Sequence, residues 1–356
     1  MPNEQKPLYI ASTAILCPLG NHFEMVNAAI TAGITNYSSS ETLDLRGNAV
    51  TTSPLPEGIF DELDAEIFDE LGSLNAFSDM TKMALATFRS LMADVTTPTK
   101  IPLIISAPKN VIEEVRTTLR DYCPDFLTNE SILSITNSRA SGITAINTAF
   151  QLLEQFPGAK YIAIGAADSL LVEETLDILI KENRTLAPGS TGGAAPGEGS
   201  AFLLLTPDVS LAKIRDNHVF SLSPPGIHYE QGYLNSNEAY TGQGLHLAFK
   251  HALKECGEKS ISRLFSSMNG ENYWSKELGV SLTRNQKCFH EKCEIHHPAE
   301  YFGDLGSAIG PTLIGLALET LSNNKDERQY LISCSADDSL RSAITIKKNP
   351  YENARH

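Results

Sequence analysis

The densest group of side chains that could bind a metal ion lies in one short segment near the C-terminus. Cys288, His290, Cys293, His296 and His297 fall within ten residues, and thiolate and imidazole groups are the ligands that zinc prefers. Zinc sites usually contain regular, closely spaced ligand pairs, whereas four residues separate the two cysteines here. We therefore expect an outer helix that leads into a strand, with the two adjacent histidines on opposite faces. Zinc binding is the less favoured alternative.

A glycine-rich stretch, residues 188–199, could in principle hold a phosphate group. It contains five glycines but no lysine, and it leads into an apolar strand rather than a helix. A phosphate-binding loop needs both the lysine and the following helix, so we interpret the stretch as a closing loop. Asp168, which follows a predicted strand, is expected to cap the next helix.

The elements that must position these side chains alternate between strands and helices along the chain. This alternation indicates an α/β fold with a largely buried sheet, and each half, 1–205 and 206–356, contains it. Residues 38–56 are rich in Ser, Thr and Pro and are interpreted as a loop. Six of the ten residues from 61 to 70 are acidic, which favours a solvated helix face over a cation or partner site. The predicted strands are 8–15, 102–107, 131–136, 161–166, 201–205, 262–268, 330–334 and 343–347, and the predicted helices are 23–32, 80–92, 111–122, 143–156, 170–181, 245–256 and 311–321.

The composition and net charge of the chain argue against several classes of function. The chain has 356 residues, 42% of them hydrophobic and 20% charged, and a formal net charge of −15. Such an acidic surface disfavours nucleic-acid backbones and anionic membranes. The sequence contains no apolar run long enough to predict a membrane span. Six cysteines are too few for a disulfide scaffold, and the apolar run 8–16 ends in a turn rather than a cleavage site. We expect a cytoplasmic protein with reduced thiols and no signal peptide.

Five motifs occur in a fixed order along nearly the whole chain. Together they resemble the thiolase-like superfamily, most closely the β-ketoacyl synthases of fatty-acid and polyketide assembly. Residues 138–142 resemble the nucleophile elbow of that family, residues 268–272 stand where it has His-Gly-Thr-Gly-Thr, and residues 302–308 where it has Gly-His-Thr-Leu-Gly-Ala-Ala. The other matching segments are 17–21, 162–168, and 186–188 with 196–200.

The resemblance implies a thiolase-like fold, with two similar α/β halves in a layered αβαβα core. It also implies a homo- or heterodimer that forms through the strand at 131–136. The chain is shorter than a typical elongating synthase, so loops that shape the acyl tunnel or the dimer are expected to be trimmed.

The resemblance further implies a Cys-His-His site, and all three of these residues are replaced in this chain. Arg139 stands at the cysteine position, Asn269 at the first histidine and Gly303 at the second. A guanidinium stays protonated and is no nucleophile, an amide cannot shuttle protons, and glycine has no side chain. Ser138 and Ser141 flank the arginine, but neither partner motif contains a histidine that could activate a hydroxyl group.

A buried arginine at the start of a helix opposes the helix dipole and needs an acidic partner. Asp304, Glu271 and Glu198 lie on the loops that should converge there. We predict an ion pair of Arg139 with Asp304 or Glu271 that fills the former pocket. Glu198 is expected to be structural, as it is in the related synthases. The alternative is a pocket in which Arg139 binds a carboxylate or phosphate ligand.

These substitutions favour a protein that binds partners and carries out no catalysis, with no cofactor. The leading hypothesis is an adaptor or accessory chaperone for a protein client, similar to thiolase-like proteins linked to type VI secretion effector loading. The alternative is a subunit like the chain-length factors, paired with an active β-ketoacyl synthase. A second alternative is an acyl-thioester hydrolase or decarboxylase that uses Ser138 or Ser141.

Overall fold

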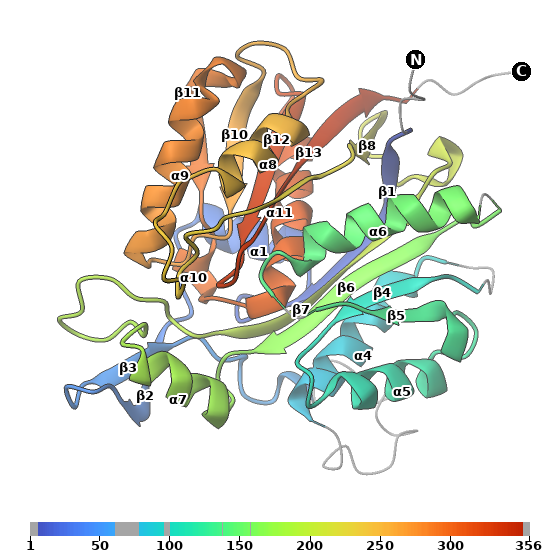
Figure 1. Cartoon of the computed structure of the whole chain (residues 1–356). Helices are drawn as coiled ribbons and strands as arrows, with labels where there is room; N and C mark the ends of the chain where they lie inside the picture. Colours follow the sequence, from blue (N-terminus) through green and yellow to red (C-terminus); the bar gives the residue numbers. More distant parts are fainter. Residues whose placement is uncertain (1–5, 61–77, 96–99, 137, 157, 352–356) are drawn as a thin grey trace, which may run out of the picture.

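The computed structural model describes residues 6–60, 78–95, 100–136, 138–156 and 158–351, and its framework is a large mixed sheet (Figure 1). Two sets of five strands within the sheet share one arrangement. In each set the order across the sheet is third, second, fourth, fifth and first strand. The first set comprises β1 (Leu8–Leu16), β4 (Leu103–Ser106), β5 (Ile132–Ser134), β6 (Ile162–Ser169) and β7 (Glu198–Thr206), and the second β8 (His218–Leu222), β10 (Ile261–Ser266), β11 (Phe289–His296), β12 (Gln329–Ser335) and β13 (Leu340–Pro350).

Short antiparallel pairing between β1 and β8, at Leu8–Leu222 and Tyr9–Ser221, joins the two sets. A further strand, β9 (Gly226–Tyr229), pairs with β13. Within each set, the fourth strand is antiparallel to the fifth, because β6 pairs with β7 and β12 pairs with β13 in that sense. The repeated strand order in the two halves agrees with the thiolase-like fold that the sequence predicted.

Two central helices, α6 (Ser141–Gln155) and α11 (Ile309–Asn323), lie in one hydrophobic core with strands of both sets. Almost every residue of α11 is buried, as expected for a helix enclosed on all sides. The two helices approach closely at Gly142, where an added Cβ atom would lie 2.4 Å from Cδ of Pro311. This contact places the start of α6 beside the start of α11.

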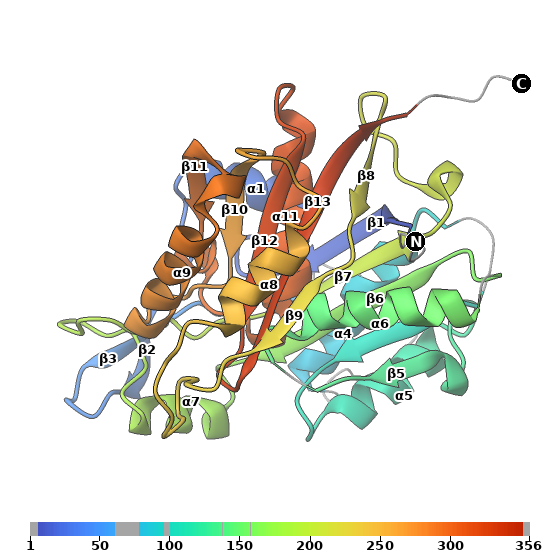
Figure 2. The ribbon, with the colours of Figure 1, turned by 45° about the horizontal axis from the view of Figure 1, so that its top comes forward.

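Outer helices complete the layers (Figure 2). α4 (Asp79–Met92) and α5 (Ile112–Tyr122) pack on the first set of strands in a second core. α8 (Gly244–Ala252) and α9 (Asn272–Arg284) pack on the second set in a third core. The two strand sets thus form two β layers, with α6 and α11 between them and the outer helices on either side, which gives the αβαβα layering. The remaining elements are α1 (Phe23–Thr31), α7 (Glu173–Lys181), α10 (Ala299–Phe302), and the 3₁₀ turns at Asn129–Ser131, Val209–Leu211, Gln286–Cys288 and Gly306–Ala308.

Two predictions of local structure were wrong. Residues 38–56 are not a loop, because they form the hairpin of β2 (Ser38–Leu43) and β3 (Ala49–Thr52). The Asp44 carboxylate organises its turn by accepting hydrogen bonds from the amides of Arg46 and Asn48, each at 2.8 Å. The segment of the Cys/His cluster is not an outer helix, because it forms strand β11, which pairs with β10. The acidic segment 61–70 lies outside the described residues.

Sheet pairing explains why β11 was missed. Its sequence is mostly exposed and polar, and it becomes a strand because β10 offers a partner edge. Among the described residues, no helix is both long enough and apolar enough to cross a lipid bilayer.

Candidate functional site: a buried arginine–carboxylate network

Five loops bring the side chains of the site together. Arg139 lies in the turn before α6, and Asn269 and Glu271 lie between β10 and α9. Asp304 lies between α10 and α11, and Asp337 lies between β12 and β13. The fifth loop follows α7 and carries Arg184, so two of the loops belong to residues 1–205 and three to residues 206–356.

Arg139 is buried, with 7% of its side chain exposed, and its donors meet acceptors of the protein. Nη1 lies 2.7 Å from Oδ2 of Asp304 and 3.9 Å from Oε2 of Glu271, and Nη2 contacts the Asp337 carboxylate. Nε donates a hydrogen bond of 3.2 Å to the carbonyl oxygen of Ser335. The guanidinium also lies 4.5 Å from the ring centre of Trp274, a cation–π distance.

A second arginine, Arg184, stands beside the first and neutralises the carboxylates that Arg139 leaves partly paired. Its Nε and Nη2 atoms bind both oxygens of Glu271 at 2.7 and 3.1 Å, which is the bidentate geometry that suits guanidinium and carboxylate. Its Nη1 atom lies 2.8 Å from Oδ2 of Asp337. Asp337 therefore bridges the two arginines.

Neutral donors complete the network. The Asn269 amide donates to Oε2 of Glu271 at 2.9 Å and to Oδ2 of Asp304 at 2.7 Å. The Trp274 indole donates to Oε2 of Glu271 at 2.9 Å, and the Gly306 amide donates to Oδ1 of Asp304 at 3.0 Å. Asn269 thus holds two carboxylates together, at the position where the resemblance implies a histidine.

The network fixes the charge state of its members. Burial opposes ionisation of Glu271, but hydrogen bonds from Arg184 and the charge of Arg139 outweigh it and hold the pKa below the ordinary value of 4.5. Burial also opposes ionisation of Asp337, yet the two arginines lower its pKa below 3.8. Burial alone would lower the pKa of Arg139, and the charges of Asp337 and Asp304 raise it instead. At neutral pH, Glu271, Asp337 and Arg139 are therefore charged.

A cavity of about 340 Å³ borders the network. Arg139, Arg184 and Asp304 form one wall, and apolar side chains of α7 such as Ile178 and Leu179 form another. Because both guanidinium groups are bound by protein carboxylates, an anionic ligand would have to displace those carboxylates. The geometry therefore favours a filled anion site over an open one, although a small cavity persists beside it.

Asp168 does not cap the following helix, which corrects the prediction made for it. Its Oδ2 atom accepts a 2.8 Å hydrogen bond from the amide of Ser307 and its Oδ1 atom accepts one of 3.0 Å from Ser169. The residue before α7 is Val172, whose side chain makes no capping hydrogen bond. Asp168 lines the cavity and ties the end of β6 to the turn before α11.

The remaining predicted site residues take structural positions. Ser141 donates to the carbonyl oxygen of Ser138 at 2.6 Å, and the Ser138 hydroxyl makes no hydrogen bond with the described residues. Glu198 accepts hydrogen bonds from the amide of Leu55 at 3.0 Å and the hydroxyl of Ser169 at 2.9 Å. Among the described residues that line the cavity there is no histidine. Neither Ser138 nor Ser141 therefore has an imidazole base in the cavity.

Gly303 occupies a backbone conformation that few other residues adopt. Its φ angle is +75°, and an added Cβ atom would lie 2.8 Å from the carbonyl oxygen of Ala195 and 3.0 Å from Cβ of Ser53. Both the left-handed backbone and the close contacts require glycine. A histidine at this position would need a different path of the chain.

The candidate metal ligands of the Cys/His segment are not brought together in the structure. Cys288 precedes β11, and His290 and Cys293 lie along it, while His296 stacks on Phe265 with ring centres 4.9 Å apart. His297 lies 3.5 Å from Glu300. Within the described part of the chain, no three His, Cys, Asp or Glu side chains form a group that could hold a metal ion.

Sequence reasoning missed Arg184, Asp337 and Trp274. Arg184 precedes the 186–188 motif by two residues, and Trp274 is the single tryptophan of the chain, yet neither feature indicates a contact with Arg139. Asp337 belongs to a short polar turn that resembles many surface turns. Only the folded arrangement of the loops reveals their roles.

The chain matches no family model and no curated protein. It does resemble solved structures. The ishigamide ketosynthase/chain length factor superposes with a TM-score of 0.73 at 14% identity, over 96% of this chain and 99% of the other. A ketosynthase in complex with its chain length factor, from Xenorhabdus doucetiae, gives 0.75 at 14% identity, over 96% and 98%. A β-ketoacyl synthase from Burkholderia phymatum gives 0.73 at 14% identity, over 96% and 99%.

At these identities the likeness shows the fold, which is the thiolase-like fold of ketosynthases and chain length factors. The neighbours named above are synthases or complexes of synthases with their partner subunits, and none is a secretion adaptor. The leading hypothesis drawn from the sequence, an adaptor for effector loading, therefore receives no support from them.

Proposed function

We propose that this chain is a non-catalytic subunit, similar to a chain length factor, that pairs with an active β-ketoacyl synthase. The single observation that carries the proposal is the position of Arg139. At the helix start where the resemblance implies a nucleophilic cysteine, a buried guanidinium is bound to carboxylates from three loops. A thioester carbonyl placed there would contact a guanidinium group that is already bound to carboxylates, and no thiolate that could attack it.

No cysteine elsewhere in the chain takes over as nucleophile. The charges of Arg139 and Asp304 act on Cys334, but burial raises the pKa of this thiol to about 12. Burial also raises the pKa of Cys17 to about 12, and the pKa values of the other four thiols are raised too. Catalytic cysteines require the opposite shift, toward the thiolate.

The partner is inferred from the fold and from one sheet edge. Strand β5 stands at the end of the strand order and, among the described strands, pairs with β4. Its Leu133 side chain is 43% exposed. This edge is where the family resemblance implies dimerisation, and complexes of a ketosynthase with its chain length factor are among the structural neighbours.

Association is tested by native mass spectrometry after co-expression with a cysteine-bearing β-ketoacyl synthase from the same cells. We expect a 1:1 heterodimer. Leu133→Asp should weaken it, because the substitution places a charge at the proposed interface. Ile295→Asp is the matched control, since Ile295 is 41% exposed on β11 at the opposite edge of the sheet. A chain that never associates with the synthase, or equal behaviour of the two variants, would contradict the proposal.

A further inference from the structure

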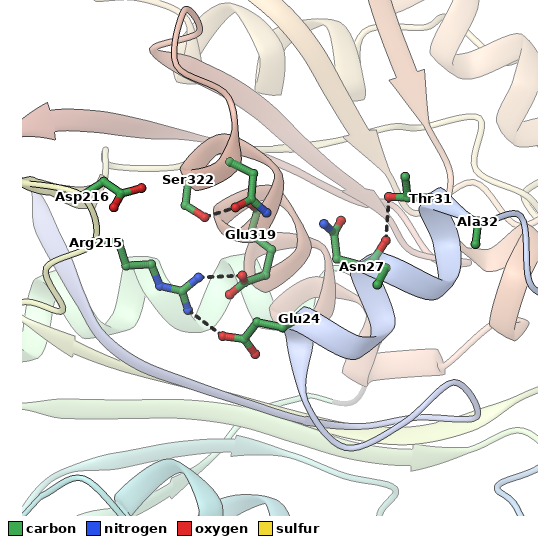
Figure 3. Close-up of a pocket in the computed structure, with 10 residues that line it drawn as sticks. Glu24, Asn27, Thr31, Ala32, Arg215, Asp216, Glu319 and Ser322 are labelled. Atoms are coloured by element: carbon green, nitrogen blue, oxygen red, sulfur yellow. Dashed lines mark hydrogen bonds and ion pairs between the residues drawn. The ribbon is translucent and has the colours of Figure 1, made fainter.

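A second cavity, of about 710 Å³, lies away from the arginine–carboxylate network (Figure 3). Its walls come from α1, from the turn at Arg215 and Asp216, and from the C-terminal end of α11. None of its lining residues belongs to the network or to the cavity beside it. Its volume is in the range of small-molecule sites, roughly 300–1,000 Å³.

Carboxylates outnumber cations in this cavity. Glu24, Asp216 and Glu319 line it together with one cation, Arg215, which gives the lining a formal charge of −2. Arg215 divides its guanidinium between two partners, with Nη1 lying 2.6 Å from Glu319 and Nη2 lying 3.3 Å from Glu24. Each of these carboxylates therefore receives one guanidinium nitrogen.

Glu319 is the unusual member, because only 2% of its side chain is exposed. One oxygen, Oε2, is bound by Arg215, whereas Oε1 is buried and has no hydrogen-bond partner among the described residues. A buried carboxylate oxygen without a donor is costly. In Figure 3 the Glu319 carboxylate is directed toward Arg215 and Glu24, on the wall of the cavity.

Helix ends add to the negative potential. Thr31 and Ala32 lie at the C-terminal end of α1, and Ser322 and Asn323 lie at that of α11, so both ends border the cavity. Neither helix carries a basic residue in its last turn. Lys348 donates hydrogen bonds to the carbonyl oxygens of Leu321 and Asn324 at the end of α11. The last turn of α1 contains no basic residue that could do the same. Helix C-termini favour cations.

We propose that this cavity binds the primary ammonium group of an aliphatic amine, with Glu319 and Glu24 as its acceptors. An ammonium group has three donors, and because Oε1 of Glu319 is closed to solvent, the Glu319 carboxylate must turn toward the cavity to accept one of them. A bare metal ion fits less well, because Arg215 stands between the two carboxylates and no group of three metal-binding side chains exists in the described chain. The ammonium can come from a free polyamine or from a lysine side chain of a protein partner.

Equilibrium dialysis of the full chain at low salt tests the proposal with two probes, spermidine and the peptide acetyl-Gly-Lys-Gly-amide. Saturable one-site binding of spermidine in preference to the peptide assigns a free polyamine. Preferential binding of the peptide assigns a lysine of a protein partner. If neither probe binds saturably, the proposal is wrong.

Variants separate the cavity from general electrostatic attraction. Glu319→Gln should weaken binding about tenfold or more, because it removes a buried charged acceptor, and Glu24→Gln should weaken it about threefold, as expected at an exposed rim. Glu255→Gln, an exposed carboxylate outside the cavity, should bind as the unmodified chain does. If Glu319→Gln does not fold, Glu24→Gln and Asp216→Asn still decide the question. Equal binding by the cavity variants and the control refutes the assignment.

Discussion

Replacing Arg139 by methionine removes the guanidinium that lies 2.7 Å from Asp304, and the three carboxylates around it respond differently. Glu271 keeps both hydrogen bonds from Arg184. Asp337 also keeps its ion pair with Arg184, and because its side chain is 47% exposed, solvent screens its charge. Asp304 has only 4% of its side chain exposed, and the loss therefore falls on this residue.

Breaking a buried ion pair by removing one partner costs about 3–5 kcal/mol. Asp304 retains hydrogen bonds from Asn269 and the amide of Gly306, which places the expected loss for Arg139→Met at the lower end, about 3 kcal/mol. Adding Asp304→Asn should restore at least half of it, because the uncompensated charge disappears and one of the two donors keeps an acceptor oxygen.

Urea unfolding measures these free energies, and Trp274, the single tryptophan of the chain, reports them by fluorescence from beside Arg139. Arg120→Met is the control, since this arginine makes an exposed pair with Asp121 and should cost less than about 1 kcal/mol. A free energy of unfolding of Arg139→Met within about 0.5 kcal/mol of that of the unmodified chain, a change typical of neutral surface positions, would contradict a stabilising ion pair of Arg139 with Asp304. A double variant no more stable than the single one would contradict it as well.

Three further results are expected. The free energy of unfolding should fall as the pH drops below about 4.5, because Glu271 and Asp337 have lowered pKa values in the folded state and their contribution is lost when they are protonated. Glu271→Gln should flatten this acid limb in urea titrations at several pH values, and an unchanged slope would count against the network. Iodoacetamide at pH 8 should leave Cys17 and Cys334 unmodified until urea is added, since burial raises the pKa of each to about 12; rapid native alkylation, read by peptide mass spectrometry, would contradict this. Gly303→His should lower the urea midpoint by the equivalent of about 2 kcal/mol or more, because of the positive φ and the contact with Ala195, and a neutral effect would show that the loop adapts.

Much of the fold follows from local patterns, since apolar runs and amphipathic periods predict β1, β6, α4 and α11 closely. Charge reasoning also places Arg139 among acids, because a buried arginine needs partners wherever the chain brings them. Arg184 and Asp337 could not be found this way. They come from loops far apart in the sequence, and nothing in their local pattern encodes the convergence of those loops. For the same reason β11 was missed, because its strand character depends on pairing with β10.

Whether the chain lacks an acyl-accepting nucleophile is measured directly by its intact mass after incubation with an acyl thioester such as hexanoyl-N-acetylcysteamine. An active β-ketoacyl synthase treated in parallel serves as the positive control. We expect the synthase to gain the mass of one acyl group and this chain to gain none, because Arg139 is no nucleophile and burial keeps the cysteines of the chain protonated. Stable, stoichiometric acylation of this chain, at Ser138, Ser141 or any cysteine, would contradict it.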